Sequence, residues 1–147
     1  MSISPIVKQV EGFTVTGFCV RTQNQDEFNE KTAKIPSLWQ QFYQSELRSN
    51  TPIFGVYSQY DSDANGYYTV TAGIQSKEAH PSLAAVHIKA GRYLVFQGTG
   101  PMPETVVETW KHVWTFFASD TMYQRNFISD FEVYHGPTQV EIYIGLK

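Results

Sequence analysis

The sequence predicts an α+β fold in which two related β-α-β-β modules form a mostly antiparallel sheet, with two helices on one face and a central ligand groove. Two observations support this prediction. Apolar patterns occur in the order strand, helix, strand, strand, and this order occurs twice. Individual residues also recur between the two rounds. The 147 residues suit a single domain, 1–147, with pseudo-repeats at about 10–76 and 85–147.

The first module begins with residues 13–21, where Val, Thr and Phe predict a strand. An apolar pattern of helical spacing follows Pro36. Residues 52–57 and 67–74 predict two further strands, joined by a turn over 61–66 that is rich in Asp, Ser, Asn and Gly.

The second module repeats this order. Residues 85–97 are of extended character, with a break at Ala90-Gly91. Residues 104–118 predict an amphipathic helix, because their apolar residues recur at spacings of three and four. Residues 131–134 and 140–146 predict two strands joined by a turn at Gly136-Pro137.

The repeat makes one difference between the modules visible. Leu38-Trp39 followed by Phe42 matches Val113-Trp114 followed by Phe117, and Phe54-Gly55-Val56-Tyr57 matches Phe131-Glu132-Val133-Tyr134. In this alignment Glu132 stands where the first module has Gly55, and Glu141 stands where it has Thr69. Acidic residues therefore occupy these positions in the second module alone.

The two glutamates are the candidate ligand-binding acids. Because side chains alternate along a strand, Glu132 and Tyr134 share a face, and we expect Glu141 and Tyr143 to join them on the side away from the helices. A buried carboxylate needs a partner, and an organic cation between aromatic rings could be that partner. The expected ligand-binding residues are Glu132, Glu141, Tyr134, Tyr143, Tyr57, Tyr93 and Trp110. The alternative is a solvated outer face with ordinary surface acids.

Composition argues against several classes of function. A net charge of −3 gives no reason to expect direct nucleic-acid binding. Cys19 is the only cysteine, which indicates a reducing compartment, and we expect it in the core. The first residues have neither a secretion signal nor a membrane span, so the cytoplasm is the expected location. Four scattered histidines predict no metal site, and no cofactor is expected.

Several motifs occur together in the second half of the chain. They are Gly91-x-Tyr93-x-x-Phe96 within residues 87–101, Trp110 and Trp114 in the predicted helix, and Glu141-Ile142-Tyr143-Ile144 near the end. In this order they resemble the GyrI-like family, the multidrug-binding effector domain that follows the DNA-binding regions of AraC-type and MerR-type regulators. The resemblance covers nearly the whole chain. It implies two β-α-β-β modules around a pocket for lipophilic, often cationic, aromatic compounds, with the family's buried pocket glutamate at Glu132.

These observations predict a stand-alone sensor or sequestering domain that binds lipophilic, cationic aromatic molecules. No helix-turn-helix segment is visible, so transcriptional control would require a separate regulator protein as partner. The alternative is a hydrolase of reactive small molecules, with a pocket glutamate as general base. No catalytic residue is assigned, because the sequence has no Gly-x-Ser-x-Gly motif and Cys19 has no candidate base near it in the sequence.

Overall fold

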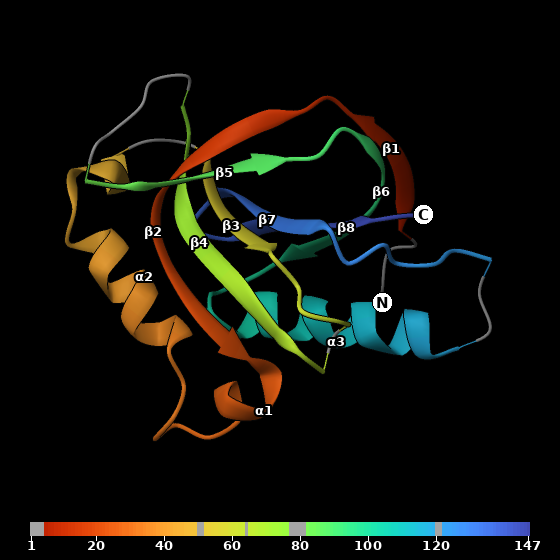
Figure 1. The fold of residues 1–147 in the computed structure, drawn as a ribbon, viewed down its shortest axis with the longest axis horizontal. Helices are drawn as coiled ribbons and strands as arrows, with labels where there is room; N and C mark the ends of the chain where they lie inside the picture. The colour runs from red at the N-terminus through yellow and green to blue at the C-terminus, as the bar shows by residue number, and fades with distance from the viewer. Residues whose placement is uncertain (1–4, 50–51, 64, 77–81, 120–121) are drawn as a thin grey trace.

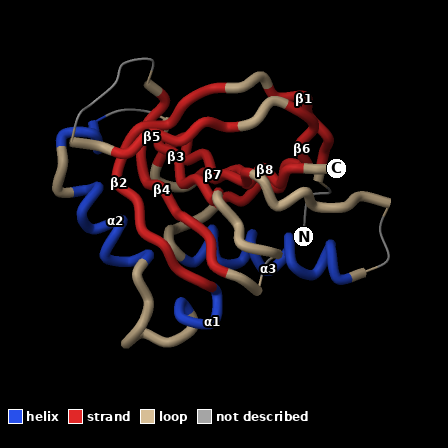
Figure 2. The backbone as a smooth tube through the Cα atoms, viewed as in Figure 1, coloured by secondary structure: helices blue, strands red, loops and turns tan. Residues whose placement is uncertain are grey.

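The computed structural model describes residues 5–49, 52–63, 65–76, 82–119 and 122–147. The elements in these ranges are coloured along the chain in Figure 1 and by type in Figure 2. They are β1 (Ile6–Val10), β2 (Phe13–Gln23), α1 (Asn24–Glu27), α2 (Ile35–Tyr43), the 3₁₀ helix η1 (Glu46–Ser49), β3 (Ile53–Ser58), β4 (Tyr67–Gln75), β5 (Ala84–Ile88), β6 (Gly91–Thr99), α3 (Glu104–Ala118), β7 (Ser129–Gly136) and β8 (Gln139–Gly145).

The strands form one sheet in the order β1-β6-β8-β7-β3-β4-β2-β5, and each neighbouring pair is antiparallel. This order is symmetric about the β3–β7 pair, where the two modules meet. Gly55 pairs with Glu132 in this ladder, so two positions that correspond in the sequence repeat lie opposite each other at the centre of the sheet. The predicted α+β class with a mostly antiparallel sheet is confirmed.

The sheet is strongly curled, as Figure 1 shows, and each module gives its first strand to the other. β1 precedes β2 in the chain but pairs with β6, whereas β5 precedes β6 but pairs with β2. Aromatic and aliphatic side chains fill the inside of the curl, among them Phe54, Val56, Phe131 and Val133. No strand was predicted at β1, and β5 and β6 were predicted as one broken extended segment.

The two longer helices pack on the other face of the sheet. Leu38 and Phe42 of α2 lie in one apolar cluster with Val70 and Ala72 of β4. Val113 of α3 lies in another, with Ile142 and Ile144 of β8 among its members. The amphipathic spacing of α3 explains this packing, and its bounds are those predicted. Because α2 contacts β2 and β4 while α3 contacts β6 and β8, the centre of this face, over β3 and β7, lies between the helices.

The predicted facing of β7 is wrong, whereas that of β8 is confirmed, because Ile142 and Ile144 pack with Val113 of α3. Phe131 pairs with Tyr143, and Glu132 pairs with Ile142, so Glu132 shares the helix-covered face and Glu141 lies on the opposite one. Next to the turn, Gly136 pairs with Gln139, and that register would place Val133 opposite Ile142. An irregularity between Tyr134 and Gly136 shifts the pairing by one residue, which exchanges the faces.

Other expectations concern single residues and excluded sites. Cys19, expected in the core, is exposed on β2. The described residues contain no helix that is long and apolar enough to cross a membrane. They also contain no group of three His, Cys, Asp or Glu side chains arranged to hold a metal ion. Residue 64, within the predicted turn over 61–66, lies outside the described residues.

Candidate ligand-binding site

A cavity of about 1140 Å³ is bounded by residues of α2 and α3 and by the β3 and β7 strands. This volume is slightly above the usual range for small-molecule sites, about 300–1,000 Å³. Most of its lining is aromatic or aliphatic. The lining residues that matter below are Glu27, Phe28, Trp39, Tyr43, Tyr57, Tyr60, Tyr68, Trp110, Trp114, Arg125, Glu132 and Tyr134.

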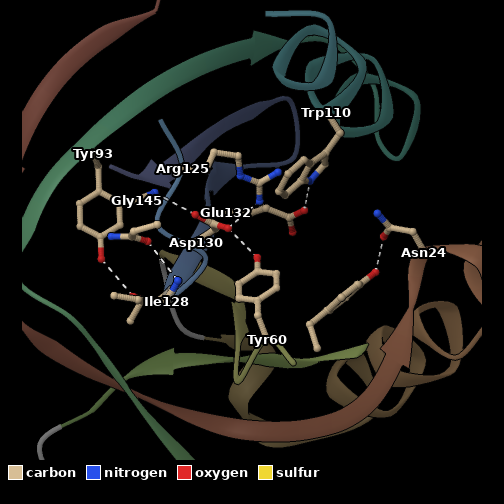
Figure 3. Close-up of polar contacts among 12 residues, drawn as sticks. Asn24, Tyr60, Tyr93, Trp110, Arg125, Ile128, Asp130, Glu132 and Gly145 are labelled. Atoms are coloured by element: carbon tan, nitrogen blue, oxygen red, sulfur yellow. Dashed lines mark hydrogen bonds and ion pairs between the residues drawn. The ribbon is translucent and has the colours of Figure 1, made fainter. Parts of the chain in front are cut away.

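Glu132 is the acid at the centre of this cavity, with only 3% of its surface exposed. Its Oε1 accepts a hydrogen bond from the Tyr134 hydroxyl at 2.9 Å. Its Oε2 accepts one from the Tyr57 hydroxyl at 2.9 Å and one from Trp110 Nε1 at 2.6 Å. Figure 3 shows the Trp110 indole reaching this carboxylate from α3. Strands β3 and β7 and helix α3 therefore supply one donor each.

Burial and hydrogen bonding act on the Glu132 carboxyl in opposite directions. Burial raises its pKa, whereas the hydrogen bonds from Trp110, Tyr134 and Tyr57 lower it, and burial prevails. The same burial, followed by the nearby Glu132 charge, raises the pKa of the Tyr57 and Tyr134 hydroxyls well above 10. The tyrosines are therefore neutral donors at neutral pH, and the Glu132 carboxylate receives no compensating charge from them.

Gly55 provides the space for the Glu132 carboxylate. A Cβ atom at position 55 would lie 2.5 Å from Glu132 Oε1, closer than such atoms approach in proteins, and 3.0 Å from Trp39 Cζ2, which is tighter than most such contacts. The glycine in the first module therefore accommodates the acid of the second module and the indole of α2.

Aromatic rings form the walls on both sides of Glu132. Trp110 packs against Tyr57 with ring centroids 5.1 Å apart, and Trp39 packs against Tyr134 at 5.5 Å. Phe28, which is 76% exposed, meets Trp114 edge-on at 6.3 Å. Both helices thus present a tryptophan to the cavity.

Four of the seven residues expected at the site line this cavity, namely Glu132, Tyr134, Tyr57 and Trp110. The other three, Glu141, Tyr143 and Tyr93, lie on the opposite face of the sheet. Tyr93 is 2% exposed, and its hydroxyl donates to the Lys89 carbonyl at 2.6 Å. Glu141 instead contacts His135 Nε2 at 2.6 Å. Glu141 and Tyr143 thus lie away from the helices, as expected, but the cavity lies on the other face, because the shift in the β7–β8 register places Glu132 there.

Trp39 and Tyr68 line the cavity and were not predicted from the sequence. Trp39 is the repeat counterpart of Trp114, and both line the cavity, so the repeat contained the signal that would have found it. Tyr68 was missed because the cavity was expected on the face away from the helices, whereas Tyr68 packs with Leu38 and Phe42 of α2 on the helix-covered face.

A second buried acid, Asp130, lies two residues before Glu132 on β7 and was also missed. It is fully buried, and its Oδ2 accepts hydrogen bonds from Arg125 Nη2 at 2.8 Å and from the Tyr60 hydroxyl. Its Oδ1 accepts one from the Gly145 backbone N–H at 2.8 Å. Figure 3 shows Arg125, Tyr60 and Gly145 converging on Asp130. Unlike Glu132, this acid has a cationic partner.

Comparison with known proteins agrees with this architecture. Residues 6–146 match the model of a family described as integron-associated effector binding proteins, Cass2. The crystal structure of the integron cassette protein VCH_CASS2, from the mobile metagenome of Vibrio cholerae, is 35% identical with a TM-score of 0.90 over 98% of this chain and 96% of that one. YobU of Bacillus subtilis (strain 168), a candidate transcriptional regulator protein, is 32% identical over 89% of this chain and 90% of its own length.

A more distant structure shares the fold alone. SAV2435, solved bound to tetraphenylphosphonium, superposes with a TM-score of 0.77 at 17% identity, over 99% of this chain and 94% of that one. The predicted relationship to effector-binding domains of transcription regulators is confirmed by the family match and by the relatives above 30% identity. The chain belongs to the family of integron-associated effector binding proteins.

Proposed function

We propose that this chain binds lipophilic organic cations, aromatic ones in particular, in the cavity between α2 and α3, as a sensor or sequestering domain. The observation that carries the proposal is the Glu132 carboxylate, which is 3% exposed and accepts hydrogen bonds from neutral donors. Within the described ranges, no Lys, Arg or His forms an ion pair with it. A buried charge without a partner is costly, and a bound cation would supply that partner.

The walls of the cavity favour a particular kind of cation. Each ring that faces a desolvated cation contributes about 0.5–2 kcal/mol, and the same rings bury the apolar part of the ligand. Trp39, Tyr57 and Trp110 lie around Glu132 in positions that suit this role. A strongly hydrated inorganic cation gains nothing from such walls, so a delocalised or alkyl-shielded positive charge is the expected class of ligand.

Calorimetric titration with tetraphenylphosphonium tests this proposal, because the fold relative SAV2435 is bound to that cation in its structure. Tetraphenylborate has nearly the same shape and the opposite charge, so it separates the charge from the apolar surface. We expect the phosphonium to bind and the borate to bind far more weakly. In the Glu132→Gln variant the phosphonium affinity should fall about 10- to 100-fold, since the amide preserves the shape and removes the charge.

Glu141→Gln is the matched control, because it removes the same charge from the opposite face of the sheet. Its phosphonium affinity should equal that of the wild type. An unchanged affinity in Glu132→Gln would remove Glu132 from the proposed role, and equal affinities for phosphonium and borate would contradict a cation site.

Hydrolysis is the alternative use of the same cavity, with Glu132 as general base. Both Glu132 oxygens already accept hydrogen bonds, which favours an acid held in place as a counter-charge. We therefore propose binding without turnover. Mass spectrometry of an electrophilic aromatic ester incubated with the protein should show the same decay for the wild type and Glu132→Gln. Faster decay with the wild type would establish the hydrolase instead.

A further inference from the structure

Arg125 lines the cavity with much of its hydrogen-bonding capacity unused. A guanidinium has five N–H donors. Nη2 donates to Asp130 Oδ2 at 2.8 Å, whereas Nε is buried with no hydrogen-bond partner. The side chain is 9% exposed, and the Phe127 ring covers one face of the guanidinium at 4.3 Å from its central carbon. An unpartnered donor at such a depth is uncommon in folded proteins.

Asp130 neutralises the charge of Arg125 but does not accept hydrogen bonds from all of its N–H groups. This carboxylate is shared among Arg125 Nη2, the Tyr60 hydroxyl and the Gly145 N–H. The Arg125–Asp130 pair is therefore electrically neutral, and the group still missing beside Arg125 is a hydrogen-bond acceptor. An oxygen atom of a ligand in the cavity is one source of that acceptor.

The position of this pair relative to Glu132 allows one ligand to reach both. Asp130 and Glu132 are two residues apart on β7, so their side chains leave the same face of the strand. Two residues of a strand span about 7 Å. Arg125 and Glu132 also line the same cavity, and Figure 3 shows them in one view with Trp110.

We propose that Arg125 forms an acceptor-binding subsite, which selects organic cations that carry an oxygen acceptor, such as a carboxylate, on the order of 7 Å from the positive centre. The cation lies against Glu132, and the acceptor takes hydrogen bonds from the guanidinium. Arginine suits this role because its planar fork of donors matches a carboxylate. This inference rests on the proposed function, since it places the cation at Glu132.

Two probes of equal chain length test the subsite, pentyltriphenylphosphonium and (4-carboxybutyl)triphenylphosphonium. We expect the wild type to bind the carboxylate probe about tenfold more tightly, because a hydrogen bond to a charged group outweighs the lost contact of a terminal methyl group. Without the subsite the pentyl probe should bind more tightly than the carboxylate probe, since it is the more lipophilic and has the higher net positive charge. Binding of the pentyl probe with no preference for the carboxylate overturns the subsite alone. Failure of both probes to bind overturns the proposed function as well.

A double variant, Arg125→Gln with Asp130→Asn, removes the guanidinium without leaving the buried Asp130 unpaired. In the wild type, the dissociation constant of the pentyl probe divided by that of the carboxylate probe should be about ten. In this variant the same ratio should fall to one or below, with folding checked by the melting temperature. The matched control is Arg21→Gln with Asp61→Asn, an exposed Arg–Asp pair outside the cavity, which should keep the ratio of the wild type. If the folded Arg125 double variant still prefers the carboxylate probe, the inference is overturned. If that variant does not fold, the affinities of the wild type for the two probes decide whether the subsite exists.

Discussion

Gly55 and Glu132 face each other across the β3–β7 pair, and a Cβ atom at position 55 would lie 2.5 Å from Glu132 Oε1. The two positions correspond in the sequence repeat, and a side chain at position 55 would require the Glu132 carboxylate to move from its observed position. One module supplies the acid, and the other supplies the space for it. The asymmetry between the modules therefore matches the space that this carboxylate occupies at the β3–β7 pair.

Gly55→Ala should therefore displace Glu132 or Trp39. The expected loss of unfolding free energy is about 1–3 kcal/mol, the usual cost of overpacking. Urea denaturation measures this loss. Combining Gly55→Ala with Glu132→Ala should restore part of it, because the second substitution removes the atom that the new methyl group meets. Strictly additive losses would show that the two positions do not interact.

The sequence contained most of this fold. The amphipathic spacing of residues 104–118 matches α3 at both ends, and the pattern after Pro36 predicted α2. β1 was missed because Ile6–Val10 is largely exposed, so its sequence lacks a buried apolar face. Its place beside β6 is a contact between distant segments, which a single-sequence pattern does not report.

Four of the seven residues expected at the site line the cavity, but the face of the sheet on which they lie was predicted wrongly. The repeat singled out Glu132, whereas the alternation of β7 was joined to that of β8 in the wrong register. A single irregularity at His135, between Tyr134 and Gly136, decides which of Glu132 and Glu141 faces the helices. Such an irregularity has no reliable sequence signal, whereas its effect extends over the whole strand pair.

Trp110→Phe should destabilise the protein through the loss of one donor to Glu132. Hydrogen bonds to charged groups contribute about 1.5–3 kcal/mol, and Trp110 Nε1 makes the shortest of the three at 2.6 Å. Trp114→Phe is the control, since Trp114 lines the cavity from the same helix and the three donors to Glu132 are Tyr57, Tyr134 and Trp110. Urea denaturation of both variants should show the larger loss for Trp110→Phe. Equal losses of unfolding free energy in the two variants would mean that the hydrogen bond from Trp110 to Glu132 does not contribute to stability.

Asp130→Asn should be more costly than substitution of a surface acid. The Asp130 side chain is fully buried and paired with Arg125, and breaking such a pair costs about 3–5 kcal/mol. Asp61→Asn breaks an exposed pair with Arg21 and should cost at most about 1 kcal/mol. Thermal unfolding of the two variants makes the comparison. The Arg125→Gln, Asp130→Asn double variant should be more stable than Asp130→Asn alone, because it leaves no buried charge unpaired.

The raised pKa of Glu132 predicts opposite pH dependences for stability and for cation binding. Its folded-state pKa lies above the ordinary value of 4.5, mainly because of burial. A group with a raised folded-state pKa stabilises the fold below its unfolded pKa, and this contribution is lost as the pH rises through the folded-state pKa. The wild type should therefore lose stability relative to Glu132→Gln as the pH rises from 4.5 through that window.

Cation binding reverses this sign, because a cation favours the carboxylate form and lowers the pKa of Glu132. The affinity for tetraphenylphosphonium should rise with pH across the same window, and binding within it should release protons. Calorimetry in buffers of different ionisation enthalpy measures the protons released, and Glu132→Gln should release none from this site. A wild-type affinity that is flat across the window, together with no proton release, would show that the cation does not lie against Glu132.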